Sequence, residues 1–259
     1  MNEFVTIDGV RLEYAWHGAS PADAPTLVFL HDGLGSIGQW RDFPAALCSR
    51  TGCGGLVYSR RGHGNSDSLT GSHAGGFMHD AALTVLPRLL DDFEIKRPIL
   101  IGHSDGASIA LIYAGSGIGH PLALVLEAPH VFVEDITVAR IAEMRELYPK
   151  TDLRTKLARH HGGNVDTLFR HWTEIWLRPE FRAWNIERYL QRVACPVLAI
   201  QGKDDEFGTE RQVEVIVSAV GDRCEALILD ECRHSPHLDR RKTVEDAMTR
   251  FIFNLQSSM

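Results

Sequence analysis

The sequence predicts an α/β fold with a mostly parallel central sheet and helices on both of its faces. Three observations lead to this prediction: short apolar runs alternate with helical patterns, a turn follows each run, and a hairpin pattern opens the chain. Strands and helices that alternate in this way are typical of right-handed βαβ units. A chain of 259 residues can form one such domain without a disulfide or a metal to stabilise it.

The first element is an N-terminal hairpin. Phe4 and Thr6 occupy alternate positions before Asp8-Gly9, and Val10, Leu12 and Tyr14 do so after it. Asp-Gly favours the positive φ angles of a tight hairpin turn, so we expect an antiparallel edge on the sheet.

The remaining elements follow in order along the chain. Buried strands are predicted at 26–31, 55–59, 98–102, 122–127, 196–201 and 225–229. Helices are predicted at 36–48, 77–93, 105–114, 209–220 and 243–255, with a kink or break at Pro87.

One stretch, residues 130–192, breaks the alternation because it is helical in pattern and has no clear strand run. We expect it to be a helical lid inserted into a core made of 1–129 and 193–259. Ligands of open α/β sheets bind beyond the carboxyl ends of the strands, which is where this insertion begins. Trp172 and Trp176 in the insertion either pack inside it or line the substrate site.

Composition narrows the possible partners. Lys and Arg number 27 and Asp and Glu number 34, so the net charge is −7, which argues against nucleic acid and anionic membrane as main partners. No apolar run is long enough to span a membrane, and we expect no secretory signal. The five cysteines are odd in number and form no CxxC, which predicts reduced thiols and a cytoplasmic protein.

Neither a metal nor a cofactor is expected. The chain has no HExxH, and no GxGxxG follows a strand, so neither a zinc site nor a dinucleotide site is predicted. The expected partner is therefore a small-molecule substrate, and both a monomer and a homodimer are compatible with the sequence.

The candidate nucleophile is Ser104, in the sequence Gly102-His103-Ser104-Asp105-Gly106. This G-x-S-x-G motif follows the apolar run at 99–101 and opens a helical run, which is the strand–turn–helix setting that it requires. The small residues let the turn close, and the start of the helix favours a developing negative charge.

A serine needs a base, and the base needs an acid to orient it. An acid and a histidine both fall just after predicted strands, in the order serine, acid, histidine. Several residues compete for the two roles. The acid is Asp204 or Asp205, with Glu206 as a weaker third, and the base is His234 or His237.

The oxyanion of such a reaction needs two N–H donors. One is expected from the residue after the nucleophile, Asp105. The other is expected from Gly33 in the glycine-rich loop that follows the strand at 26–31.

Taken together, these motifs resemble the α/β-hydrolase superfamily over nearly the whole chain. His31–Ser36 is similar to its oxyanion loop, and Arg60–Ser66 to its Arg-Gly-x-Gly-x-Ser loop. The resemblance favours Asp205, in a Gly-x-x-Asp turn, and His234, in a loop similar to Gly-His-Ser. Asp32 and Arg233 depart from the pattern because each replaces a usual glycine.

The resemblance implies an α/β-hydrolase fold and a serine hydrolase that cleaves a small carboxylic ester through Ser104, Asp205 and His234. Other reactions by the same three residues, C–C bond hydrolysis or lactone opening, remain open. So does a ligand-binding receptor with slow turnover. The expected substrate-binding residues are Asp32, His103, Glu127, Trp172 and Trp176.

The elbow Ser104-Asp105-Gly106 is also similar to that of the biphenyl-hydrolase-like branch, which includes valacyclovir hydrolase. In that branch the Asp is associated with the ammonium group of amino-acid esters. Here Asp105 either has that role or favours the helix N-terminus electrostatically.

Overall fold

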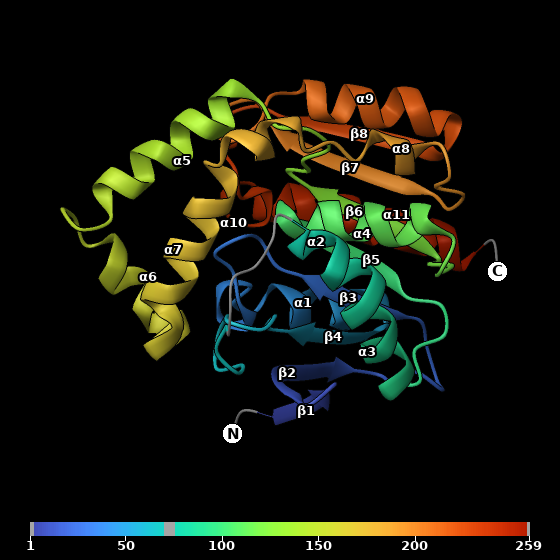
Figure 1. The fold of residues 1–259 in the computed structure, drawn as a ribbon. Helices are drawn as coiled ribbons and strands as arrows, with labels where there is room; N and C mark the ends of the chain where they lie inside the picture. Colours follow the sequence, from blue (N-terminus) through green and yellow to red (C-terminus); the bar gives the residue numbers. More distant parts are fainter. Residues whose placement is uncertain (1–2, 70–75, 258–259) are drawn as a thin grey trace.

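The fold is built around one eight-stranded sheet with the strand order β1-β2-β4-β3-β5-β6-β7-β8 (Figure 1). The computed structural model describes residues 3–69 and 76–257. The strands are β1 Glu3–Ile7, β2 Val10–Gly18, β3 Thr26–Leu30, β4 Gly54–Tyr58, β5 Ile99–His103, β6 Ala123–Glu127, β7 Val197–Gly202 and β8 Cys224–Leu229. From β4 to β8 all neighbours are parallel, while β2 pairs antiparallel with both β1 and β4. The predicted α/β-hydrolase fold is confirmed.

The N-terminal hairpin forms as predicted. Ile7 pairs with Val10, and the two residues between them, Asp8 and Gly9, have φ angles of 51° and 77°. Two positive φ angles match the right-handed twist of the flanking strands, and Asp-Gly is suited to them.

Helices cover both faces of the sheet. The core helices are α1 Phe43–Thr51, α2 Phe77–Asp80, α3 Leu86–Asp92, α4 Asp105–Ser116, α9 Arg211–Val220, α10 Pro236–Asp239 and α11 Arg241–Gln256. Alternate residues of a strand reach different layers: Leu27 and Phe29 of β3 pack with α1 and α11, whereas Val28 and Leu30 pack with α3 and α4. Burial on both faces explains why these strands are continuous apolar runs.

Two predicted helices differ from the observed ones. The helix expected at 36–48 is replaced by a 3₁₀ turn at Ile37–Gln39 and by α1, because Arg41 between them has a φ of 54°. The helix expected at 77–93 contains a π-helical turn at Ala81–Val85 before Pro87. A π turn leaves backbone groups unpaired in the α-helical pattern, which accommodates the missing N–H of proline.

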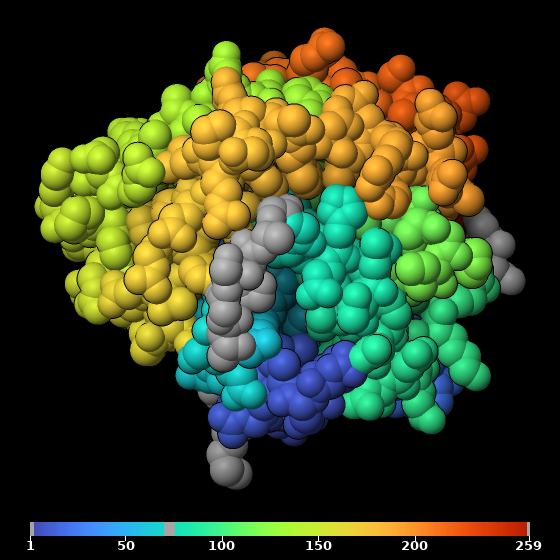
Figure 2. Space-filling view, viewed as in Figure 1, coloured from blue at the N-terminus to red at the C-terminus, as the bar shows by residue number. Residues whose placement is uncertain are grey.

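The stretch from 130 to 192 is helical, with α5 Asp135–Leu147, α6 Leu153–His161, α7 Val165–Trp176 and α8 Glu187–Leu190. Helices α5, α6 and α7 project to one side of the sheet (Figure 1) and form a continuous mass there (Figure 2). They enclose a small apolar cluster of their own, which also takes in Leu34 from the loop after β3.

Within the described parts of the chain, no helix has the length and apolar character needed to cross a membrane.

Candidate active site

Ser104 lies at a sharp turn between β5 and α4, with φ 54° and ψ −116°. A non-glycine residue in this conformation is strained, and such strain concentrates at functional sites. The two motif glycines make the turn possible. A Cβ on Gly102 would overlap the Gly106 carbonyl, and a Cβ on Gly106 would overlap the Leu30 carbonyl of β3. Larger residues are therefore excluded at both positions.

The turn brings Ser104 to His234 and Asp205. The Ser104 Oγ lies 3.0 Å from His234 Nε2, and His234 Nδ1 lies 2.9 Å from both Asp205 carboxylate oxygens. Asp205 is itself held by the Gln201 amide at 2.7 Å and by the Phe207 N–H at 2.8 Å. Three loops at the carboxyl ends of β5, β7 and β8 thus supply a continuous hydrogen-bond chain.

In this series of hydrogen bonds, the positive charge of a protonated His234 and the negative charge of Asp205 stabilise each other. Burial lowers the pKa of His234, but attraction to Asp205 outweighs that effect and the net pKa is raised. Burial likewise raises the pKa of Asp205, yet His234 and the Phe207 N–H bring the net pKa below its ordinary value. An ionised Asp205 fixes the Nδ1–H tautomer of His234 and leaves Nε2 free to accept a proton from Ser104.

The competing acids and bases are exposed or have other partners. Asp204 is exposed, and Glu206 bonds the Arg233 guanidinium at 2.8 Å. His237 is buried, with its Nδ1 2.8 Å from the Glu127 carboxylate. The geometry therefore favours Asp205 and His234.

The loop after β3 is held by Arg60. Its guanidinium donates to the His31 carbonyl and, at 2.8 Å, to the Asp32 carbonyl. His31 accepts the Arg60 N–H at Nε2, so its Nδ1–H also donates to Asp32 O, at 2.8 Å. In a planar trans peptide the N–H points opposite to the C=O. Fixing Asp32 O thus aims the Gly33 N–H away from Arg60.

The second expected donor, the Asp105 N–H, lies in the first turn of α4, where backbone N–H groups have no partner in the helix. Across residues 3–69 and 76–257, neither Gly33 N nor Asp105 N donates a hydrogen bond to an internal acceptor. Both residues line the cavity that contains Ser104.

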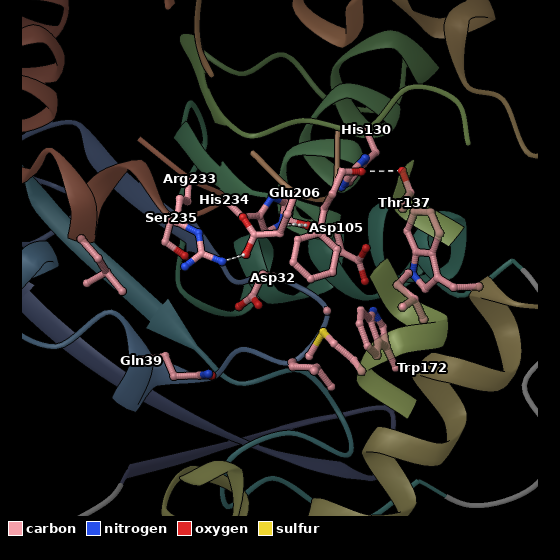
Figure 3. A pocket seen from close by; sticks show the side chains of 18 of the residues that line it. Asp32, Gln39, Asp105, His130, Thr137, Trp172, Glu206, Arg233, His234 and Ser235 are labelled. Atoms are coloured by element: carbon pink, nitrogen blue, oxygen red, sulfur yellow. Dashed lines mark hydrogen bonds and ion pairs between the residues drawn. The ribbon is translucent and has the colours of Figure 1, made fainter. Parts of the chain in front are cut away.

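This cavity has a volume of about 360 Å³ (Figure 3). Asp32, Trp172 and Trp176 are among the residues that line it, with the two tryptophans contributed by α7. Figure 3 shows Asp32, Asp105, Glu206 and His234 grouped around the cavity, and Trp172 to one side. No cluster of three or more potential metal ligands occurs in the described part of the chain.

Two predicted substrate contacts, His103 and Glu127, lie outside this cavity wall. His103 is buried and its Nε2 lies 2.7 Å from the His234 carbonyl oxygen. Glu127 has no exposed surface and accepts hydrogen bonds from the N–H and the ring of His237. Both residues contact the segment that carries His234 and His237, so the structure does not place these two expected substrate contacts at the Ser104 cavity.

Asp105 is a carboxylate of the Ser104 cavity whose pKa is changed mainly by burial. Burial raises its pKa to about 7, with Arg60 opposing and Asp32 adding to the shift. Its Oδ2 is buried and has no hydrogen-bond partner among residues 3–69 and 76–257. Asp105, Gly33 and Trp172 also line a second cavity of about 600 Å³, whose walls include Leu12, Tyr58, Phe77, Leu168 and Ile175.

Several further residues of the Ser104 cavity were not among the expected site residues. Phe207 packs on His234 with ring centroids 4.5 Å apart, and the His130 ring lies 5.7 Å from the same imidazole. Burial lowers the pKa of His130 to about 3, so it is neutral. Thr137 and Met144 enter from α5. The position of His130 at the end of β6 was the available clue.

The family model for the alpha/beta hydrolase family matches residues 27–247. The chain belongs to the alpha/beta hydrolase family. This assignment agrees with the strand order and with the strained turn at Ser104.

Curated relatives match parts of this hydrolase. A 2-succinyl-6-hydroxy-2,4-cyclohexadiene-1-carboxylate synthase from Salmonella agona is 31% identical over 117 residues, which cover 45% of this chain and 43% of the relative. An sn-1-specific diacylglycerol lipase from Danio rerio is 34% identical over 92 residues, which cover 36% of this chain and 27% of the relative. The chain thus matches less than half the length of these relatives.

Solved structures match the whole hydrolase fold. A structure reported with the carboxylesterases of Nitrososphaera gargenis has a TM-score of 0.79 at 21% identity and covers 99% of this chain and 100% of its own. The enol-lactonase from Burkholderia xenovorans LB400 has a TM-score of 0.76 at 19% identity and covers 98% and 100%. These similarities support the fold.

Replacing Gly106 with alanine is expected to displace the turn at Ser104, because the new Cβ would overlap the Leu30 carbonyl. Overpacking of this kind costs about 1–3 kcal/mol. Urea unfolding should show the loss, and Gly163→Ala, at a position where a Cβ meets nothing within 4 Å, is the control. Equal stability of Gly106→Ala and the parent would contradict the steric account.

Proposed function

We propose that this hydrolase is a serine hydrolase that cleaves a small carboxylic ester through an acyl-enzyme. The observation that carries the proposal is the hydrogen-bond chain from Ser104 through His234 to Asp205. A lone serine hydroxyl is a weak nucleophile, and this arrangement supplies both the base and the group that orients it.

The reaction proceeds in two steps. Ser104 Oγ attacks the ester carbonyl carbon while His234 Nε2 takes its proton, and the carbonyl oxygen becomes an oxyanion held by the N–H groups of Gly33 and Asp105. The C–O bond to the alcohol breaks, and His234 gives its proton to the leaving oxygen. Water, deprotonated by His234, then attacks the acyl carbon, the bond from this carbon to Ser104 Oγ breaks, and His234 returns the proton to Ser104 as the acid leaves.

The substrate class is supported by the cavity and the structural neighbours. A cavity of about 360 Å³ suits a small acyl or alcohol group next to Ser104. A carboxylesterase and an enol-lactonase share the fold, and a lactone is an internal ester opened by the same steps. Lactone opening is therefore the second candidate activity.

Ser104→Ala removes the proposed nucleophile. We expect kcat/KM for p-nitrophenyl acetate to fall by a factor on the order of 10⁴ or more, because attack by water lacks the covalent route. The control is Ser116→Ala, at the far end of the same helix, where the hydroxyl bonds Tyr113 O. Hydrolysis by Ser104→Ala at the rate of the parent would overturn the proposed function.

The pH profile should report on His234. The neutral imidazole is the base, and the Asp205 carboxylate raises its pKa above the ordinary value of 6.5. We therefore expect kcat/KM to be lost as the pH falls, with the acidic limb centred above pH 6.5.

Asp205→Asn should move this limb to lower pH, since it removes the attraction that stabilises the imidazolium. Asp204→Asn, at the exposed neighbour, is the matched control. A limb that stays in place in Asp205→Asn would assign the titration to another group.

We further propose that Asp105 recognises a substrate ammonium group. Its Oδ2 is buried without a hydrogen-bond partner in the part of the chain that the structure describes, and its raised pKa means that a nearby cation would restore the ionised form. The adjoining cavity of about 600 Å³, largely apolar in its walls, offers room for a side chain on the same substrate. Together these features support an apolar amino-acid ester as substrate.

Asp105→Asn should then raise the KM for amino-acid p-nitrophenyl esters relative to neutral esters of the same size. A lost charge-assisted hydrogen bond of about 1.5–3 kcal/mol corresponds to roughly a tenfold to hundredfold change in the KM ratio. Asp204→Asn is again the control. If cationic and neutral esters change alike, ammonium recognition is wrong.

A further inference from the structure

The loop that carries Gly33 has its carbonyl groups bound, one after another, by side chains from other segments. Arg60 binds the His31 and Asp32 carbonyls, and His63 Nε2 lies 3.2 Å from Gly33 O. The next carbonyl, that of Leu34, lies 2.9 Å from His161 Nε2. His161 is the member of this set that comes from the inserted helices, at the end of α6.

His161 has one defined tautomer in this arrangement. Its Nδ1 accepts the Gly64 N–H at 3.0 Å, so that nitrogen carries no proton. The neutral ring therefore carries its proton on Nε2 and donates to Leu34 O. Burial lowers the pKa of His161, which keeps the ring neutral. One side chain thus joins α6 to both the Gly33 loop and the Arg60–Ser66 loop.

The hydrogen bond from His161 to Leu34 O is connected to the Gly33 peptide through a single turn of the backbone. Orienting the Leu34 carbonyl also orients the N–H of the same peptide, which belongs to Gly35. The Gly35 N–H donates to Asp32 O at 3.2 Å. Asp32 O belongs to the peptide whose N–H is that of Gly33, the proposed oxyanion donor.

The side chain of Leu34, like its carbonyl, contacts the inserted helices. It packs in the apolar cluster of the inserted helices with Leu157, Val165, Leu168 and Phe169. In addition, the Cα of Gly33 is so close to α7 that a Cβ there would overlap Trp172 Nε1. Two consecutive residues of the loop are therefore held by α6 and α7.

We propose that His161 is a positioning residue that couples the docking of α6 and α7 to the oxyanion-binding loop, so that the oxyanion site is complete only while these helices are in place. The proposal rests on the proposed function, since it needs Gly33 to act as an oxyanion donor. It gives the inserted helices a role in forming the site in addition to covering it.

Two substitutions separate the two hydrogen bonds of His161. In His161→Asn the amide oxygen takes the place of Nδ1 and can accept the Gly64 N–H, but the bond to Leu34 O is lost. In His161→Gln the amide nitrogen takes the place of Nε2 and can donate to Leu34 O, but the acceptor for Gly64 is lost. Asn164→Ala is the control, because it removes the hydrogen bonds of the inserted segment to Gly64 O, Ser66 O and Ser68 Oγ and leaves the bond to Leu34 O untouched.

The measurements are kcat and KM for p-nitrophenyl acetate, together with the melting temperature of each variant. An oxyanion contact acts mainly in the transition state, so its loss lowers kcat with little change in KM. We expect His161→Asn to lower kcat on the order of tenfold, less than the 10²–10³ for removing a donor outright. His161→Gln should keep more of the kcat than His161→Asn, and Asn164→Ala should keep all of it.

The proposal is overturned if His161→Asn keeps its kcat, or if the three variants lose kcat in step with their melting temperatures. Should His161→Asn not fold, Leu157→Ala tests the same coupling by loosening the cluster around Leu34, and an unchanged kcat there overturns it as well. Ser104→Ala is measured alongside. If Ser104→Ala is inactive and His161→Asn is fully active, the coupling alone fails; if Ser104→Ala is active, the proposed function itself fails.

Discussion

The strained backbone of Ser104 is the constraint on which the site depends. A φ of 54° at this residue exists because β5, α4 and the end of β3 pack so closely that only glycine fits at 102 and 106. The same packing places the start of α4 beside the loop after β3, so that Gly33 and Asp105 line one cavity. The packing of the sheet thus determines where the hydroxyl and the two proposed oxyanion donors meet.

Buried charge is distributed among distinct partners around this turn. Asp205 faces His234, Glu127 faces His237, and Arg60 holds backbone carbonyls of the Gly33 loop. Asp105, like Glu127 and Glu206, has a buried oxygen without a hydrogen-bond partner in the described part of the chain, and burial raises its pKa to about 7. Carboxylate side chains therefore support three roles that we propose. Asp205 orients the base, Glu127 holds the segment that carries His237, and Asp105 binds a cationic group.

Much of the fold and site could be predicted because local chemistry specified it. Asp8-Gly9 requires the turn that forms, and the strand–turn–helix context of Ser104 places it correctly. The helix at 36–48 was predicted wrongly because nothing local marks Arg41 as left-handed. His103 and Glu127 do not line the Ser104 cavity, because proximity to a strand end does not tell which side chains face it. The contact between His161 and Leu34 spans 127 residues of sequence and could only be found in the folded chain.

The central claim is that His234 and Asp205 activate Ser104 as a nucleophile, and covalent labelling tests it most directly. The protein is treated with a fluorophosphonate probe at neutral pH and the labelled peptide is identified by mass spectrometry. The account predicts one adduct per chain, on Ser104, formed much more slowly in His234→Ala. Labelling at another residue, or labelling of Ser104 at an equal rate without the imidazole, would contradict it.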